Sequence, residues 1–128
     1  MTQEESIKLQ ELHNLFLKDC ERVADILGEY DVFTEYYDNI HFADTFNICD
    51  GDVSWEGDEY WAFQGHEHHS GFFPLGYLVM SEEELRAEAS KLNDEYLDKK
   101  RKQEDEKEKR QKEMEYQDYL KLKEQFEK

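Results

Sequence analysis

Three histidines fall within four consecutive positions, in the segment Gly65-His66-Glu67-His68-His69-Ser70-Gly71. In an extended chain alternate side chains share one side, so His66 and His68 point together while Glu67 and His69 face the opposite way. Two imidazoles on one side are able to bind Zn²⁺ or Ni²⁺ if other parts of the fold supply further ligands. The spacing differs from H-E-x-x-H, which places two histidines one helical turn apart. The alternative is a polar hairpin loop from Gly65 to Gly71, so we expect no cofactor and keep His66 and His68 as the metal candidates.

A second group of residues combines carboxylates with aromatic rings. The segment from Asp50 begins like a calcium loop, but Trp55 stands where that loop needs glycine and Trp61 where it needs an acid. Asp50-Gly51 and Gly57-Asp58 are dipeptides typical of hairpin turns. Aromatic rings bordered by carboxylates suit contacts with Arg and Lys. The residues that we predict to bind a partner are Asp50, Asp52, Trp55, Glu56, Asp58, Glu59 and Trp61. The alternative is that one tryptophan belongs to the core and that the acids are only turn residues.

Motifs typical of enzymes are missing from the sequence. There is no nucleophile elbow, phosphate-binding loop, dinucleotide fingerprint or cysteine–histidine motif. The two cysteines, Cys20 and Cys49, lack metal-type spacing, and we expect both to be reduced thiols. The sequence therefore predicts a protein that is not an enzyme.

Two helices and a set of short strands are expected to position these residues. Thr2 and Glu5 form a capping box, and apolar residues at spacings of three or four follow, including Leu9 and Leu12, so we predict a helix over 3–27 with Gly28 as its C′ stop. From Tyr30 the period changes to two, most clearly from Ile40 to Ile48, which predicts an antiparallel meander of three or four strands. A second capping box, Ser81 with Glu84, predicts a helix from there to about residue 127.

This second helix divides into zones of different character. Residues 98–113 are almost entirely charged, and either a solvated helix or disorder fits them. Apolar residues then return, and those that we predict to mediate self-association are Met114, Tyr119, Leu122 and Phe126. The predicted fold is α+β, with an N-terminal helix packed on a small antiparallel β-meander and followed by a long C-terminal helix. We expect an acidic globular domain over 1–97 and a charged helical extension over 98–128.

The charge is concentrated in the first of these regions. Residues 1–97 contain 23 Asp and Glu against 5 Lys and Arg, a net charge of −18. Such a field repels nucleic acid and anionic lipid and attracts basic surfaces, although it also serves solubility. We therefore expect a protein partner with a basic surface and no direct contact with nucleic acid or membrane. The N-terminus has no secretion signal and no apolar run is long enough to span a membrane, which predicts a cytoplasmic location.

The run from Trp55 to Phe63, together with Phe73-Pro74-Leu75 and the helix start Met80–Leu85, resembles small accessory proteins of bacteriophages. The resemblance implies a protein that acts inside a bacterial host cell, in a class that includes anti-CRISPR proteins and other acidic inhibitors of nucleic-acid enzymes. The leading hypothesis is an acidic, nucleic-acid-mimicking interaction protein that occludes a basic, nucleic-acid-binding surface of a partner. The alternatives are a helical scaffold that forms a homodimer and a metal-binding protein that uses the histidine segment.

Overall fold

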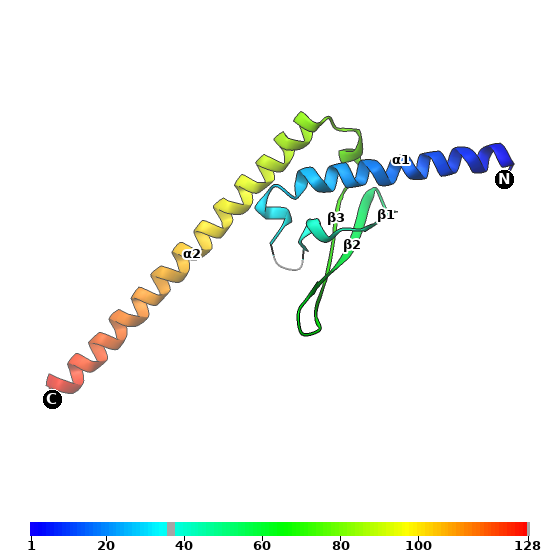
Figure 1. The fold of residues 1–128 in the computed structure, drawn as a ribbon. Helices are drawn as coiled ribbons and strands as arrows, with labels where there is room; N and C mark the ends of the chain where they lie inside the picture. The colour runs from blue at the N-terminus through cyan, green and yellow to red at the C-terminus, as the bar shows by residue number, and fades with distance from the viewer. Residues whose placement is uncertain (36–37, 128) are drawn as a thin grey trace. The chain divides into compact units, whose positions relative to one another are not determined.

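The computed structural model describes residues 1–35 and 38–127 and confirms the α+β class. Figure 1 shows the order of the elements along the chain. They are α1 (Gln3–Leu27), β1 (Thr45–Cys49), β2 (Asp52–Trp61), β3 (Gly65–Pro74) and α2 (Glu82–Glu127), with short 3₁₀ helices at Asp31–Phe33, Ile40–Phe42 and Leu75–Val79. The chain forms two compact units, Met1–Asn93 and Asp94–Lys128, so the first turns of α2 belong to the first unit.

Helix α1 begins and ends where its sequence predicts. The backbone N–H of Glu5 donates to the Thr2 hydroxyl over 3.1 Å, which satisfies one of the free donors of the first turn. Gly28 follows the last turn in the right-handed region, at φ −64°, rather than in the left-handed conformation of a C′ glycine. Its lack of a side chain serves close packing instead, because a Cβ there would lie 2.7 Å from the His41 ring.

Only the second half of α1 faces the core. Cys20, Val23 and Leu27 are fully buried, whereas Leu9 and Leu12 are more than half exposed. The apolar spacing of α1 predicts one buried face along the whole helix, and this prediction is wrong for the first half. The three-stranded sheet is too small to cover all 25 residues of the helix. The apolar residues of α1 therefore extend beyond the surface on which the helix packs.

The sheet is an antiparallel meander in the order β1-β2-β3. Its first turn is at Asp50-Gly51, as predicted, and both residues adopt positive φ, 47° and 82°. The second turn is not at Gly57-Asp58, which lies in the middle of β2. It is formed around Phe63 and Gln64, at φ 66° and 63°, so Gly65–Gly71 is part of strand β3 and not a loop.

Gly57 has a steric reason to be glycine inside a strand. A Cβ at this position would lie 1.5 Å from the carbonyl oxygen of Phe42, which belongs to the 3₁₀ helix Ile40–Phe42. That segment had the alternation of a strand but forms a helical turn, because the Asn39 side chain accepts the His41 N–H over 3.1 Å and stabilises the turn. The strand pairing starts later, at Thr45.

The core lies between α1, the sheet and the start of α2. Leu85 and Ala89 of α2 are fully buried, and the Ser81 hydroxyl accepts the Glu84 N–H over 3.2 Å in the second capping box. The remaining buried apolar residues of the core are Cys20, Val23, Ala24, Ile26, Leu27, Ile40, Phe46, Val53, Trp55, Phe73 and Tyr77. In the described part of the chain, no helix is both apolar and long enough to cross a bilayer.

Candidate functional site on the β2–β3 hairpin

Strands β2 and β3 form a long hairpin whose two faces carry different chemistry. The register pairs Asp58 with His68, Glu59 with Glu67 and Tyr60 with His66. Because successive residues alternate between faces, Asp58 and the histidines His66 and His68 share the outer, exposed face. Glu59, Glu67 and the third histidine share the inner face, on which the core residues of both strands also lie.

On the outer face, the Asp58 carboxylate forms hydrogen bonds with the imidazoles of two histidines. Asp58 Oδ1 lies 2.9 Å from Nε2 of His66 and 2.9 Å from Nδ1 of His68. Hydrogen bonding from His68 and then from His66 lowers the pKa of Asp58 below its usual value. The hydrogen bond to Asp58 raises the pKa of His68, with smaller contributions from the nearby charges of Glu56 and Asp44. The two predicted metal candidates thus lie on one side, as expected, and share Asp58 as a partner.

On the inner face, the third histidine meets two glutamates. His69 Nε2 lies 3.0 Å from a carboxylate oxygen of Glu59 and 3.9 Å from one of Glu67. The imidazole is buried and stacks on the Phe42 ring, with centroids 4.9 Å apart and planes at 13°. Within the described residues, it is this trio, and not the pair of His66 and His68, that brings three metal-ligating atoms within 4.8 Å of one another.

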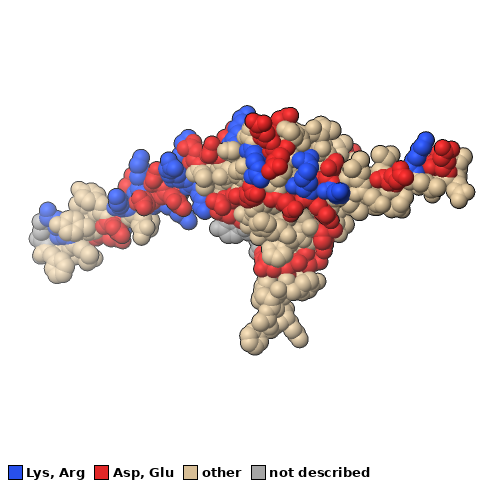
Figure 2. All heavy atoms as spheres, turned by 45° about the horizontal axis from the view of Figure 1, so that its top comes forward, with Lys and Arg blue, Asp and Glu red and all other residues tan. Residues whose placement is uncertain are grey.

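The end of the hairpin is aromatic. Tyr60 is 73% exposed, Trp61 is 51% exposed and Phe63 is fully exposed. Tyr60 stacks on His66 at 4.8 Å, and Gly65 leaves room for the Trp61 indole, since a Cβ on Gly65 would lie 1.7 Å from its Nε1. Figure 2 shows acidic side chains in a band across the first unit, and beyond that band a projection without charged side chains.

The structure separates the seven predicted partner-binding residues. Asp50 and Asp52 lie at the β1–β2 turn, and Asp52 is six residues from Asp58, about 20 Å along the strand. Glu56 and Asp58 share the outer face, whereas Glu59 is on the inner face. Trp61 is near the exposed tip.

Trp55 has to be corrected as a surface anchor. It is 3% exposed and belongs to the core, where its indole packs over Gly71, since a Cβ there would meet the ring at 2.7 Å. The alternative that one tryptophan is a core residue is therefore the right one for Trp55. Its inward direction follows from the alternation of β2, in which Val53 and Gly57 are also buried.

Three residues of the hairpin were not among the predicted site residues. The sequence pattern predicts a loop at Glu67 and His69, and Phe63 is not among the predicted binding residues. Once the segment Gly65–Pro74 is known to be a strand, the period of two places Glu67 and His69 on one face. The signal was therefore present, but the pairing with β2 was needed to interpret it.

The predicted self-association residues lie in the second unit. Met114, Tyr119, Leu122 and Phe126 are all exposed on α2. The last three are spaced by three and four residues, so they share one face of the helix. Self-association through them remains a prediction.

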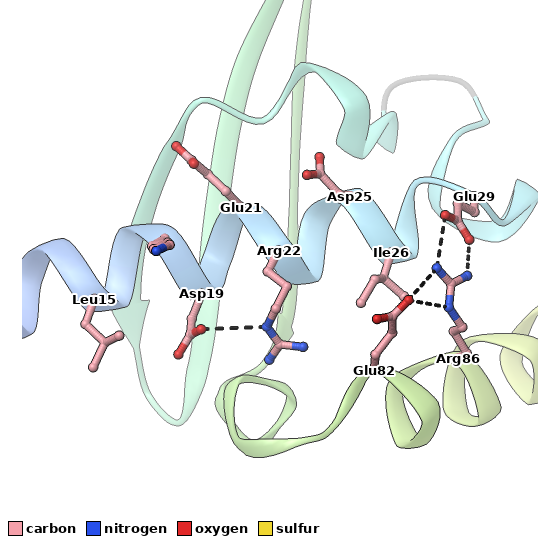
Figure 3. A pocket seen from close by; sticks show the side chains of 10 residues that line it. Leu15, Asp19, Glu21, Arg22, Asp25, Ile26, Glu29, Glu82 and Arg86 are labelled. Carbon is pink, nitrogen blue, oxygen red and sulfur yellow. Dashed lines mark hydrogen bonds and ion pairs between the residues drawn. The ribbon is translucent and has the colours of Figure 1, made fainter.

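A groove on the first unit lies between α1 and the start of α2, and Figure 3 shows its lining. Its two arginines have internal partners. Arg86 forms ion pairs with Glu29 and Glu82, and Arg22 donates to the carbonyl oxygens of Leu78 and Met80 over 3.4 and 3.2 Å. The Arg86 contacts tie the start of α2 to the end of α1, and the Arg22 contacts tie α1 to the segment that precedes α2, so both arginines are paired within the chain.

No protein-family model matches this chain, and neither a curated protein nor a solved structure is significantly similar to it. The geometry of the hairpin is therefore the basis on which a function is assigned.

Proposed function

We propose that this protein is an interaction protein and that its β2–β3 hairpin docks on a basic surface of a partner protein. The observation that carries the proposal is the aromatic end of the hairpin, where Tyr60, Trp61 and Phe63 are exposed. Tyr60 shares the outer face of β2 with the acids Glu56 and Asp58. Tyrosine and tryptophan supply much of the binding free energy in protein interfaces, and large exposed aromatics in one place are unusual on a surface that binds nothing.

The negative charge of the sheet favours a partner with a basic surface. From Val23 to Leu85 the chain has 15 Asp and Glu and no Lys or Arg, so the sheet and its turns contribute only negative charge apart from the histidines. Arginine and lysine on a partner would pair with the carboxylates and lie on the aromatic faces. Such a field also accelerates the encounter and weakens as salt rises.

The partner class that we propose is a nucleic-acid-binding protein, because surfaces dense in Arg and Lys are those that contact phosphate backbones. Docking of the hairpin would cover such a surface and keep nucleic acid from it. This is the mode of action of an inhibitor, and it agrees with the resemblance to bacteriophage accessory proteins. It requires no catalytic step by this chain.

The test compares charge reversal on the hairpin with the same reversal elsewhere. Glu56→Lys with Asp58→Lys changes the outer face, and Glu4→Lys with Glu11→Lys makes an equal change in net charge on the first half of α1. The immobilised chains are exposed to bacterial lysate at low and high salt, and captured proteins are identified by mass spectrometry. We expect a nucleic-acid-binding protein that is retained by the wild type and the α1 variant at low salt and lost by the hairpin variant. Equal loss in both variants would mean that only net charge matters, and equal retention would remove the hairpin from the interface.

A second candidate function is homodimerisation through α2. It is favoured by the shared face of Tyr119, Leu122 and Phe126, whose apolar side chains are exposed. Sedimentation of the wild type and of Leu122→Glu with Phe126→Glu decides it. A wild-type monomer at high micromolar concentration would exclude this role.

A further inference from the structure

The inner face of the hairpin holds a cluster that the docking proposal does not use. Glu59 and Glu67 lie directly opposite each other across β2 and β3, and His69 is two residues further along β3, on the same face. One ligand atom from each residue lies within 4.8 Å of the other two. The ligand atoms therefore converge from two strands on one point.

The distances in this cluster suit a single metal ion. Zinc lies about 2.0–2.2 Å from nitrogen and oxygen ligands, which separates the ligand atoms of a tetrahedral site by roughly 3.3–3.6 Å. The His69 Nε2 to carboxylate distances are 3.0 Å for Glu59 and 3.9 Å for Glu67, on either side of that range. Small side-chain rotations would bring all three atoms into the coordination sphere.

The charges of the cluster favour a divalent cation. Like charges directly opposite each other on neighbouring strands destabilise a sheet, and Glu59 and Glu67 are such a pair. The ion-pair partner that the structure gives both of them is His69. An imidazolium carries one positive charge against the two carboxylates, whereas a divalent ion neutralises both.

His69 itself points to a ligand in the cluster. It is 1% exposed, and within the described residues its Nδ1 has no hydrogen-bond partner. The polar contacts of the buried ring are therefore all made through Nε2, toward the two glutamates. The nitrogen that this buried ring turns toward both carboxylates is therefore the one that a metal ion in the cluster would bind.

We propose that Glu59, Glu67 and His69 bind one divalent transition-metal ion of the zinc class, with water completing its coordination. One imidazole nitrogen with two carboxylates suits Zn²⁺ and its first-row neighbours, whereas Ca²⁺ takes six to eight oxygen ligands and Mg²⁺ retains most of its water. The two carboxylates are about one-third exposed, at 32% and 30%, so water and the ion reach the site from that side. The ion would link β2 to β3 close to the aromatic end.

The test measures zinc binding to the full chain, prepared without a histidine tag and freed of metal with a chelator. Calorimetric titration with Zn²⁺ is expected to show one saturable site per chain. Glu59→Gln and Glu67→Gln keep the side-chain volume and remove a charged ligand, and each should weaken binding at least about tenfold. The matched control is His66→Gln with His68→Gln on the outer face, which should leave the affinity within about twofold. Nitrogen chemical shifts of the His69 ring should move on zinc addition in the wild type.

Several outcomes would overturn this inference. They are the absence of a saturable site, affinity unchanged in Glu59→Gln and Glu67→Gln, loss of binding in the outer-face control, and Ca²⁺ or Mg²⁺ binding as tightly as Zn²⁺. A His69 ring signal that does not respond to zinc would also reject it, independently of any variant's folding. The docking test changes Glu56 and Asp58 but none of the three ligands, so the failure of one proposal leaves the other standing.

Discussion

Replacing Gly57 by alanine should destabilise the first unit more than any surface substitution. The added Cβ would lie 1.5 Å from the carbonyl oxygen of Phe42 and 2.4 Å from its carbonyl carbon. Real Cβ contacts essentially never fall below 3.0 Å, so the two backbones must separate by at least 1.5 Å. Both colliding atoms are main-chain atoms, so no side-chain rotation relieves the contact.

The size of the effect follows from competing terms. Alanine loses less backbone entropy than glycine on folding, which alone would add about 0.4–1 kcal/mol of stability. Forcing extra volume into a packed region costs about 1–3 kcal/mol, and a clash between backbones belongs at the upper end. The net loss should be about 2 kcal/mol. For a unit of this size 1 kcal/mol shifts the melting temperature by about 4–8 °C, so a decrease of roughly 8–16 °C is expected.

The assay is thermal unfolding followed by circular dichroism, together with Gly76→Ala as a matched control. A Cβ on Gly76 would meet nothing within 4 Å, so this variant should be as stable as the wild type or slightly more stable. If Gly57→Ala melts within about 2 °C of Gly76→Ala, the close approach of Phe42 to β2 is refuted. The support that Phe42 gives to the His69 ring would be refuted with it.

Four further predictions concern the two thiols, an ion pair and the second unit. Cys49 should react with a thiol reagent at pH 8 while buried Cys20, whose pKa is raised to about 11 by burial, stays unmodified; equal labelling in a mass spectrum would contradict this. The folded thiol of Cys20 keeps its proton up to about pH 11 whereas the unfolded thiol loses it near pH 9, so the free energy of unfolding should fall between about pH 9 and 11, and Cys20→Ala should remove that part of the fall. Hydrogen bonding from Arg86 lowers the pKa of Glu29 in the folded chain. The stability that this ion pair contributes is therefore fully present above the ordinary Glu pKa of 4.5 and is lost as the pH falls through the lower pKa of the folded state. Glu29→Gln should therefore flatten the decline of the urea midpoint in acid, and an unchanged decline would exclude the contribution. A chain ending at residue 97 should keep the melting transition of the full chain, and loss of that transition would show that the first unit needs the second.

The parts of the fold that the sequence predicts are those with local signals. Helix α1 matches its predicted bounds, Gln3–Leu27, because a capping box and a glycine mark its ends. The start of α2 has the same kind of mark at Ser81, and the turn at Asp50-Gly51 uses residues that tolerate positive φ. None of these features depends on a distant part of the chain.

The sequence-based predictions are wrong where a residue's role depends on a contact with a distant part of the chain. Gly57 looks like a turn residue, but it is glycine because Phe42, fifteen positions earlier, passes against it. The polar residues of Gly65–Gly71 suggested a loop, but β2 supplies their partners. The inner cluster depends on the register between Glu59 and Glu67, which no single segment contains. The exposed first half of α1 shows in addition that an apolar pattern does not guarantee a surface to cover it.

The length of β1 has a consequence for how the hairpin moves. β1 pairs with β2 only from Asp52 to Glu56, so from Gly57 to Trp61 the sheet has two strands instead of three. Two-stranded segments are marginally stable on their own, and they open in fluctuations that leave the rest of a domain folded. Amide hydrogens of the paired residues beyond Gly57 should therefore exchange with solvent faster than those around Val53. Binding of a metal ion or a partner at this end of the hairpin should slow the exchange of these amide hydrogens. The exchange rates in the three-stranded part should stay unchanged.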